Sequence, residues 1–528
     1  MVNGRPARTA SPPEPPISGS PAGNRAQHPG AGAEGDRGGR PEPKPEKRDP
    51  MSMTDLDAPQ RSGGGHLGRR SSLDRPVIRA QAVDLGFWCA TAAAGLLLAA
   101  LLRRADLLEA TSFPLVWRTP RLGPSVLLPV LVASITLALA RRSTRVRWPV
   151  LLLLGFVGSL LWSVALATAA GPDLSSGLHP PPAYLAVADT VDDDPLAYLA
   201  HWTTPFLDGS PSTAADGSAG AAAPAAGMPA AEQVARQPPG PVLLVWLLGR
   251  LGLGAAPGGG GGLALGLVLT ALAAASVPLI AVAVRSLCHE TAARRAVPVL
   301  VLTPWALWAA ASPRAVTVLP AAAALAVGVV GCEPGRRWRL LWALLSGLLL
   351  GITSLFDYGA VWLGVGVAAA YFVRRRPLMN VFTGLGALLP FWLYFAWGFS
   401  WPDGLAQARA DVGLGTALAW LALDAVVVLL AGGPVVIRAL RRIRLTPGWP
   451  FLVGAGAAAL FSLCAGLAWG GVEQTWLPLA PWLAVAALAP RPRPDGPGDT
   501  VRAGDLPLLL IGAGALGAVA LRVLLSSG

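Results

Sequence analysis

The carboxylates best placed for chemistry lie in one polar interruption, from Gly171 to Gly240, of an otherwise apolar sequence. Asp173 opens this loop directly after a long apolar run. A carboxylate at a membrane boundary is partly desolvated, so its proton affinity rises and it can take a proton from an attacking hydroxyl group. A Gly-Pro-Asp turn that ends a helix accounts for the same residue without chemistry. Asp173 is therefore a candidate general base, with the turn as the alternative.

The same loop carries a run of three aspartates that ends at Asp194, immediately before Pro195. An aspartate followed by proline is typical of a helix amino terminus, where its side chain accepts backbone hydrogen bonds and stabilises the helix by about 1 kcal/mol. Asp194 is thus predicted to be the N-cap of a helix over 196–202. The alternative is that it binds a cation or a ligand hydroxyl group.

The loop closes on Arg236, Gln237, Pro238, Pro239 and Gly240. The two prolines fix an extended backbone before the next helix, and a glycine there allows another backbone or a ligand to approach closely. The guanidinium of Arg236 would lie at headgroup depth, where it suits a lipid phosphate. A rigid helix start with an interfacial arginine is the alternative.

Three more acidic positions follow later in the chain. Glu473 lies at the end of an apolar run, beside Trp476, which fits the aromatic belt at a membrane interface. Asp403 lies in an acidic turn that begins at Trp401. Asp424 lies in the middle of an apolar run, and a carboxylate in the middle of a membrane span indicates function.

Composition determines the class of protein that must position these residues. Hydrophobic residues make up 53% of the chain and charged residues only 14%, well below the roughly 25% of soluble domains. Apolar runs recur near the roughly 20 residues needed to cross a bilayer. The fold class is therefore all-α, a polytopic transmembrane helical bundle. The positive net charge belongs to arginines at the ends of these runs, so no nucleic-acid partner is expected.

Cysteine and histidine spacing gives no sign of a metal centre. The four cysteines and five histidines are scattered without paired spacing. No cofactor is expected on this basis, although a divalent metal at the carboxylates stays an open alternative.

The distribution of arginines predicts the topology. Basic clusters recur at one end of successive apolar runs, and the turns between them, near Ser312, Asp357, Asp403 and Glu473, are uncharged or acidic. The positive-inside rule then places the basic turns in the cytoplasm and the acidic turns outside the plasma membrane. About 13 spans result if the short segment 241–253 is re-entrant or interfacial.

Four regions follow from this pattern. Residues 1–80 are rich in Pro, Gly and Ser and are predicted to be a disordered cytoplasmic tail. Two transmembrane helices follow within 81–148. Residues 149–490 form a transmembrane core with the external loop 171–240, and 491–528 form a linker and the last helix.

The order of these features resembles the GT-C glycosyltransferases, the polytopic class that includes the protein O-mannosyltransferases. It is most similar to uncharacterised actinobacterial integral membrane proteins of that class, which carry His-Pro-Pro-Gly before an apolar helix and a late Glu-x-x-x-x-Trp-Leu-Pro segment. Here Gln237 to Gly240 and Glu473 with Trp476 stand in those places. The resemblance covers about residues 149–490. Gln237 departs from it, because glutamine cannot take a proton as histidine does.

The resemblance implies transfer of a sugar from a polyprenyl-phosphate donor to a cell-envelope acceptor outside the cytoplasm, with the lipid bilayer as the other partner. Asp173 would be the base, and Glu473 a second catalytic residue. The implied substrate-binding residues are Arg236, which would stabilise the leaving phosphate, and Gln237, Pro238, Pro239, Gly240, Asp194, Asp403 and Trp476. A multi-pass transporter or lipid flippase, favoured by Asp424, and a non-catalytic relative are the alternatives.

Overall fold

The described part of the chain is almost entirely helical. The computed structural model describes residues 70–104, 116–117, 123–169, 174, 184–191, 193–202, 234, 237–254, 261–409, 414–442, 446–468, 472–486 and 506–526. Two short strands, β1 (Val116–Trp117) and β2 (Leu525–Ser526), pair in antiparallel fashion. Residues 1–69 of the predicted tail lie outside the described residues. Helix α1 begins at Arg70, inside the segment for which the sequence predicts disorder.

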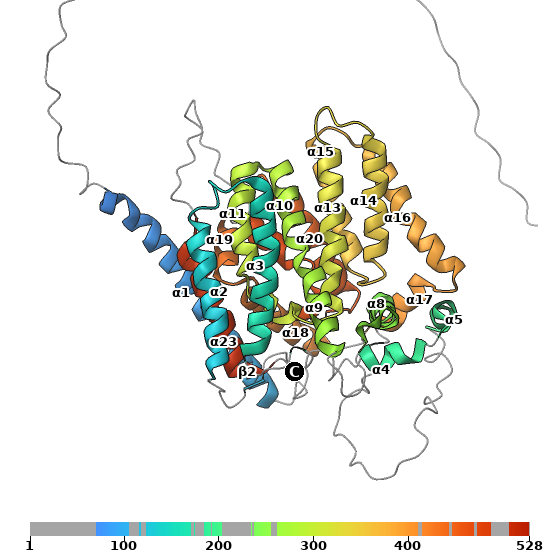
Figure 1. Ribbon diagram of the computed structural model, residues 1–528, viewed down its shortest axis with the longest axis horizontal. Helices are drawn as coiled ribbons and strands as arrows, with labels where there is room; N and C mark the ends of the chain where they lie inside the picture. The colour runs from blue at the N-terminus through green and yellow to red at the C-terminus, as the bar shows by residue number, and fades with distance from the viewer. Residues whose placement is uncertain are drawn as a thin grey trace, which may run out of the picture. The chain divides into compact units, whose positions relative to one another are not determined.

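The helices follow one another with short connections through most of the chain (Figure 1). The first group comprises α1 (Arg70–Arg104), η1 (Pro124–Val126), α2 (Leu127–Ala140), α3 (Trp148–Ala169), α4 (Tyr184–Ala188), η3 (Asp189–Val191), α5 (Pro195–Ala200), α8 (Gly240–Leu248) and the π-helical η4 (Gly249–Leu253). The middle group comprises α9 (Gly261–Ala274), α10 (Ser276–Leu287), α11 (Glu290–Val301), α12 (Ala306–Ala309), η5 (Arg314–Thr317), α13 (Val318–Gly331), α14 (Arg339–Thr353), η6 (Ala360–Leu363), α15 (Gly364–Val373) and α16 (Met379–Ala396). The last group comprises α17 (Trp401–Ala408), α18 (Leu414–Gly432), α19 (Pro434–Arg442), α20 (Trp449–Cys464), α21 (Val472–Thr475), α22 (Ala480–Ala486) and α23 (Leu508–Leu524).

Several helices are long and apolar enough to cross a bilayer, which confirms the prediction of a multi-pass helical membrane protein. In the described residues the six that meet this requirement are Ile78–Leu102, Trp148–Ala169, Gly262–Leu287, Arg314–Gly331, Met379–Ala396 and Gly415–Gly432. Six further apolar helices have 10–17 residues. The count of about 13 spans stays a prediction.

The segment that follows the long loop is shorter than a span. The nine residues of α8 and the five of η4 together measure about 21 Å at 1.5 Å per residue. A bilayer core is about 30 Å thick. The segment is therefore too short to cross as one helix, as the sequence predicts.

Four of the described basic turns, near Ser143, Ser286, Glu333 and Arg374, meet at one end of the bundle, which we call the basic end. Arg294 donates to the carbonyl oxygen of Ser143 at 3.1 Å. Arg374 donates to the carbonyl oxygen of Ser286 at 2.6 Å, and the Ser286 hydroxyl donates to Glu333 at 2.6 Å. Turns that are far apart in sequence are thus tied together, in agreement with the predicted alternation.

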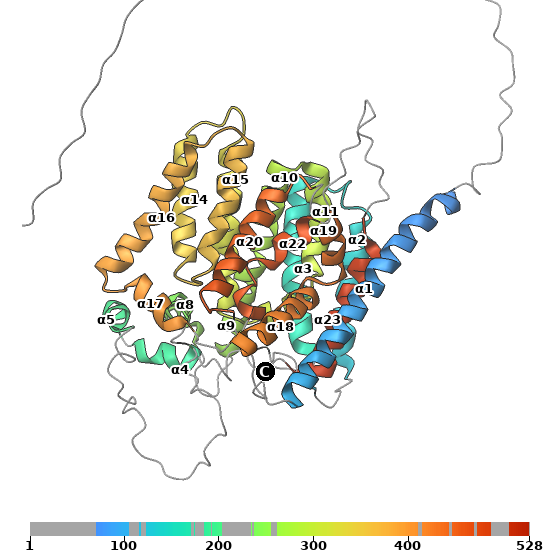
Figure 2. The ribbon, with the colours of Figure 1, turned by 180° about the vertical axis from the view of Figure 1, so that it is seen from behind.

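The opposite end of the bundle, which we call the acidic end, carries the turn with Asp357 and the short helices α17 and α21, which contain Asp403 and Glu473. The upright helices α3, α13 and α14 run up the page in Figure 1, and α4, α5, α8 and α17 gather at their lower end. The view from behind shows α18 near the same lower end (Figure 2). Alternating helix directions therefore bring these acidic residues to one end of the bundle.

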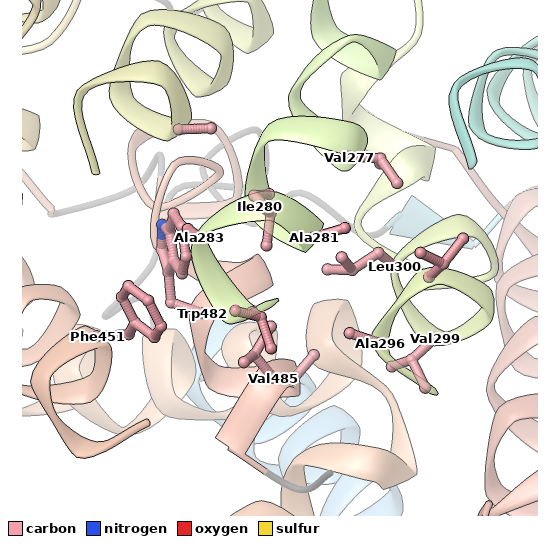
Figure 3. Close-up of a cluster of buried hydrophobic side chains, with 14 of the residues drawn as sticks. Val277, Ile280, Ala281, Ala283, Ala296, Val299, Leu300, Phe451, Trp482 and Val485 are labelled. Carbon is pink, nitrogen blue, oxygen red and sulfur yellow. The ribbon is translucent and has the colours of Figure 1, made fainter. Parts of the chain in front are cut away.

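The core between the helices is packed with small and branched side chains. Val277, Ile280 and Leu300 are almost fully buried where α10 and α11 meet, and Trp482 of α22 lies beside Phe451 of α20 (Figure 3). The two aromatic rings stack with their centroids 4.7 Å apart. This core fixes the helices whose ends carry the candidate site.

Helices α14 and α16 approach each other through glycines. A Cβ atom built on Gly347 would lie 1.9 Å from the carbonyl oxygen of Thr383, and one built on Gly386 would lie 2.1 Å from that of Leu344. Small residues at such positions let two membrane helices bring their backbones together. The contact cannot accept a side chain at either glycine without moving a helix.

Candidate functional site

Arg314 is the centre of a polar cluster at the acidic end. It is the first residue of η5, which follows Pro313, and its side chain is only 12% exposed. Its Nη2 donates to the Thr475 hydroxyl at 2.9 Å and lies 3.9 Å from Oδ2 of Asp357. Both contacts use Nη2. The other two nitrogens of the guanidinium, Nε and Nη1, have no hydrogen-bond partner among the described residues. One edge of a largely buried guanidinium is thus left for an anion.

Asp357 holds its turn together and faces Arg314 at the same time. Its Oδ1 accepts the backbone N–H groups of Gly359 at 2.7 Å and Ala360 at 2.9 Å. Burial raises the pKa of the Asp357 carboxyl, and the charge of Arg314 and the two N–H groups lower it in part. Turn formation alone therefore does not account for Asp357, because its second oxygen points to the cation.

Glu473 lies on α21, the short helix that packs against α12, η5 and α18. Its Oε2 is buried and has no hydrogen-bond partner among the described residues. Burial raises the pKa of the Glu473 carboxyl, and the nearby Arg314 charge lowers it in part. Such a carboxylate has the raised proton affinity that a general base needs.

Asp424 lies in the middle of α18, the helix that packs against α21. The residue is 2% exposed, and no described residue forms a hydrogen bond with its Oδ2. Since α18 and α21 are in contact, Asp424 and Glu473 belong to one buried polar region. An ionisable residue inside a membrane span is costly and marks function more often than structure.

Gln237 occupies the position at which the resemblance implies histidine. The Tyr184 hydroxyl donates a hydrogen bond to Oε1 of Gln237. Tyr184 is buried, which raises the pKa of its hydroxyl, and the charge of Arg314 lowers that pKa in part. Gln237 thus acts here as a hydrogen-bond acceptor near Arg314.

Gly240 joins the start of α8 to the turn that carries Asp357. Its backbone N–H donates to the carbonyl oxygen of Leu355 at 2.8 Å, and Pro238 and Pro239 before it are buried. A Cβ atom on Gly240 would lie 2.4 Å from that carbonyl oxygen. The close backbone approach predicted for this glycine is confirmed.

The Gly240→Ala variant is expected to be less stable than the parent protein by about 1–3 kcal/mol, because the added methyl group forces α8 away from Leu355. The midpoint of thermal unfolding in detergent measures this effect. The matched control is Gly249→Ala, at the other end of α8, where nothing lies within 4 Å of the new Cβ atom. Equal midpoints for the two variants would contradict the close contact.

Three other residues that the sequence predicts to bind substrate have no hydrogen bond or ion pair with Arg314. Asp194 is an exposed N-cap of α5, and its Oδ1 accepts from the N–H groups of Leu196 at 3.1 Å and Ala197 at 2.9 Å. The N-cap prediction is confirmed, and a ligand role for Asp194 stays a prediction. Asp403 is exposed in the first turn of α17. Trp476 is half-buried beside α21, and its Nε1 has no partner in the described region.

Asp173 and Arg236 lie outside the described residues. The residue that sequence reasoning missed is Arg314. The sequence prediction describes the turn near Ser312 as uncharged. The structure corrects this, because Arg314 is two positions further on and its side chain is only 12% exposed. The sequence did contain a signal for this residue. Arg314 lies in a turn that is predicted to be external, and the positive-inside rule expects few arginines in such turns.

The described residues contain no group of three or more His, Cys, Asp or Glu side chains placed to hold a metal ion. The cluster instead offers one cation, two buried carboxyl groups without complete partners, and a glutamine oxygen. Comparison with known proteins adds nothing to this picture: no family model, curated protein or solved structure matches the chain.

Proposed function

We propose that this chain is a membrane glycosyltransferase of the GT-C type. It moves a sugar from a polyprenyl-phosphate donor to a hydroxyl group of a cell-envelope acceptor outside the plasma membrane. The observation that carries the proposal is the largely buried Arg314, whose side chain is 12% exposed and whose Nε and Nη1 have no hydrogen-bond partner in the described region. A guanidinium in that state suits the phosphate that leaves during sugar transfer.

Transfer requires one bond to form and one to break. The acceptor oxygen bonds to the anomeric carbon, the bond from that carbon to the phosphate oxygen breaks, and its electron pair leaves with the phosphate. Arg314, together with Arg236, stabilises the charge on this leaving group. The acceptor proton passes to a carboxylate, for which Glu473 and Asp173 are the candidates.

The surroundings of α21 suit a ligand rich in hydroxyl groups. Trp305 and Trp308 lie in or next to α12, which packs against α21, and the indole N–H groups of both and of Trp476 have no partner among the described residues. These three donors lie in the same region as the carboxyl group of Glu473, whose oxygens accept hydrogen bonds when ionised. Donors and acceptors together match the hydroxyl groups of a sugar.

The Glu473→Gln variant is expected to transfer sugar at least about 100-fold more slowly, because an amide cannot accept the acceptor proton. Purified protein in lipid nanodiscs would be given radiolabelled polyprenyl-phosphate mannose or arabinose with envelope acceptors. Asp173→Asn tests the second candidate base in the same assay. The control is Glu290→Gln at the basic end. The proposal fails if the parent protein transfers sugar from no donor, or if both candidate bases can be replaced without loss.

A proton-coupled transporter is the second candidate function, and Asp424 favours it. A carboxyl group in the middle of a span with an unpaired oxygen is suited to carrying a proton. If the chain is a transporter, Asp424→Asn abolishes proton-coupled uptake into vesicles. If it is a transferase, the same variant keeps sugar transfer within a fewfold of the parent rate.

A further inference from the structure

An apolar groove of about 760 Å³, counting the part open to the outside, runs between helices α2, α3 and α11. Ile135 and Leu139 of α2, Leu154 and Leu161 of α3, and Val301 of α11 line it. The four leucine and isoleucine side chains are more than one-third exposed. Because α3 is long and apolar enough to span a membrane, this exposed groove suits a lipid acyl chain.

The groove ends at four arginines in the turn between α2 and α3. Arg141, Arg142, Arg145 and Arg147, which we call the arginine turn, are all exposed. Ser143 and Val146, between them in sequence, line the groove itself. The cationic turn and the apolar walls therefore belong to one surface.

The positive charge of the arginine turn is not neutralised by the described residues. No carboxylate among them lies within ion-pair distance of any of its four guanidinium groups. The neighbouring Arg285 and Arg294 differ, because both pair with Glu290, at 2.8 and 2.6 Å. Four positive charges thus remain for an anion from outside the described chain.

The arginine turn is held in place by the bundle. Arg294 of α11 donates to the carbonyl oxygens of Ser143 at 3.1 Å and Val146 at 2.5 Å. Its guanidinium and that of Arg285 also lie over the ring of Trp148, 5.8 and 4.6 Å from the centroid. The anchoring bonds therefore hold the backbone of the arginine turn at a fixed position beside the groove.

We propose that this groove binds an anionic glycerophospholipid of the leaflet at the basic end. One acyl chain lies along the apolar walls, and the headgroup phosphate contacts the arginine turn. A zwitterionic lipid would fill the walls equally well but would leave net positive charge at the turn. Anionic headgroups are attracted by about 1 kcal/mol for each basic residue near the membrane surface, so charge sets the preference. The inference does not depend on the proposed enzyme activity.

A photocrosslinking experiment tests the preference. The full chain is reconstituted in phosphatidylcholine nanodiscs with a trace of phosphatidylglycerol that carries a diazirine on one acyl chain. We expect crosslinks to map to residues 127–140 and 148–161. Unlabelled phosphatidylglycerol is expected to compete, and added phosphatidylcholine is not.

Matched double variants separate the groove from general surface charge. Arg141→Gln with Arg145→Gln is expected to lower labelling at least about tenfold. Arg337→Gln with Arg339→Gln removes two exposed arginines from another turn of the basic end and is expected to leave labelling unchanged. Val157→Phe, which adds volume inside the groove, is expected to block labelling while the arginines remain. Gel filtration checks that each variant is folded.

Three outcomes overturn the proposal. Crosslinks spread evenly over the spans would mean that no site exists. Equal competition by both lipids, or an equal loss in the two double variants, would remove the anionic preference. Crosslinks from one copy of the chain to another would identify a second copy, instead of a lipid, as the occupant of the groove.

Discussion

Replacement of Arg314 by methionine is expected to lower the rate of sugar transfer at least about a thousandfold, a loss seen when a cation that stabilises a transferring phosphate is removed. Methionine keeps most of the buried volume and removes the charge. The leaving phosphate would then develop its negative charge without Nε and Nη1 of Arg314. The single-turnover rate with radiolabelled donor measures the loss, and donor binding is followed separately.

The control must allow for the buried partner of Arg314. Removal of one member of a buried ion pair costs about 3–5 kcal/mol in stability, because the other charge is left alone. The double variant Arg314→Met with Asp357→Asn removes both charges and is expected to recover much of the stability but none of the activity. Arg250→Gln removes an exposed arginine that pairs with Asp193 at 2.5 Å and is expected to be active. An active double variant would contradict the role of Arg314.

Replacement of Gly347 by leucine is expected to destabilise the protein by about 3 kcal/mol or more, because the new side chain cannot fit between α14 and α16. Its Cβ atom alone would lie 1.9 Å from the carbonyl oxygen of Thr383. The midpoint of thermal unfolding in detergent and the yield of monodisperse protein measure the effect.

Gly384 provides the matched control for this prediction. It lies on α16, one residue after Thr383, and nothing comes within 4 Å of a Cβ atom placed on it. Gly384→Leu is therefore expected to leave the unfolding midpoint nearly unchanged. If both leucine variants were equally stable, α14 and α16 would not be packed through their backbones as described.

Much of the structure around Gly240 could be predicted from the residues alone. A glycine allows another backbone to approach whatever the rest of the chain does, and Gly240 does meet another backbone at Leu355. The extended backbone predicted for the two prolines is wrong at Pro239, whose φ of −70° and ψ of −14° are helical. Asp194 caps α5 for an equally local reason, since its side chain bonds N–H groups two and three residues later.

The cluster around Arg314 could not be predicted in this way. Its hydrogen bond to Thr475 joins residues 161 positions apart, and no local pattern links the two. Gln237 stands where the resemblance implies histidine, but its hydrogen-bond partner is Tyr184, 53 positions earlier, which that resemblance does not predict. Both contacts exist because separate helix ends meet.

The sequence by itself determined that the protein is a helical membrane protein, which helix ends are basic, and how single turns and caps are built. These properties depend on the apolar content and charge of short segments, which each segment carries alone. Only the tertiary structure decided that Arg314, Asp357, Glu473 and Thr475 share one site, and that α2, α3 and α11 leave an open groove. Such arrangements follow from how the helices pack against one another, for example through Gly347, and that packing is a sum of contacts spread along the whole chain.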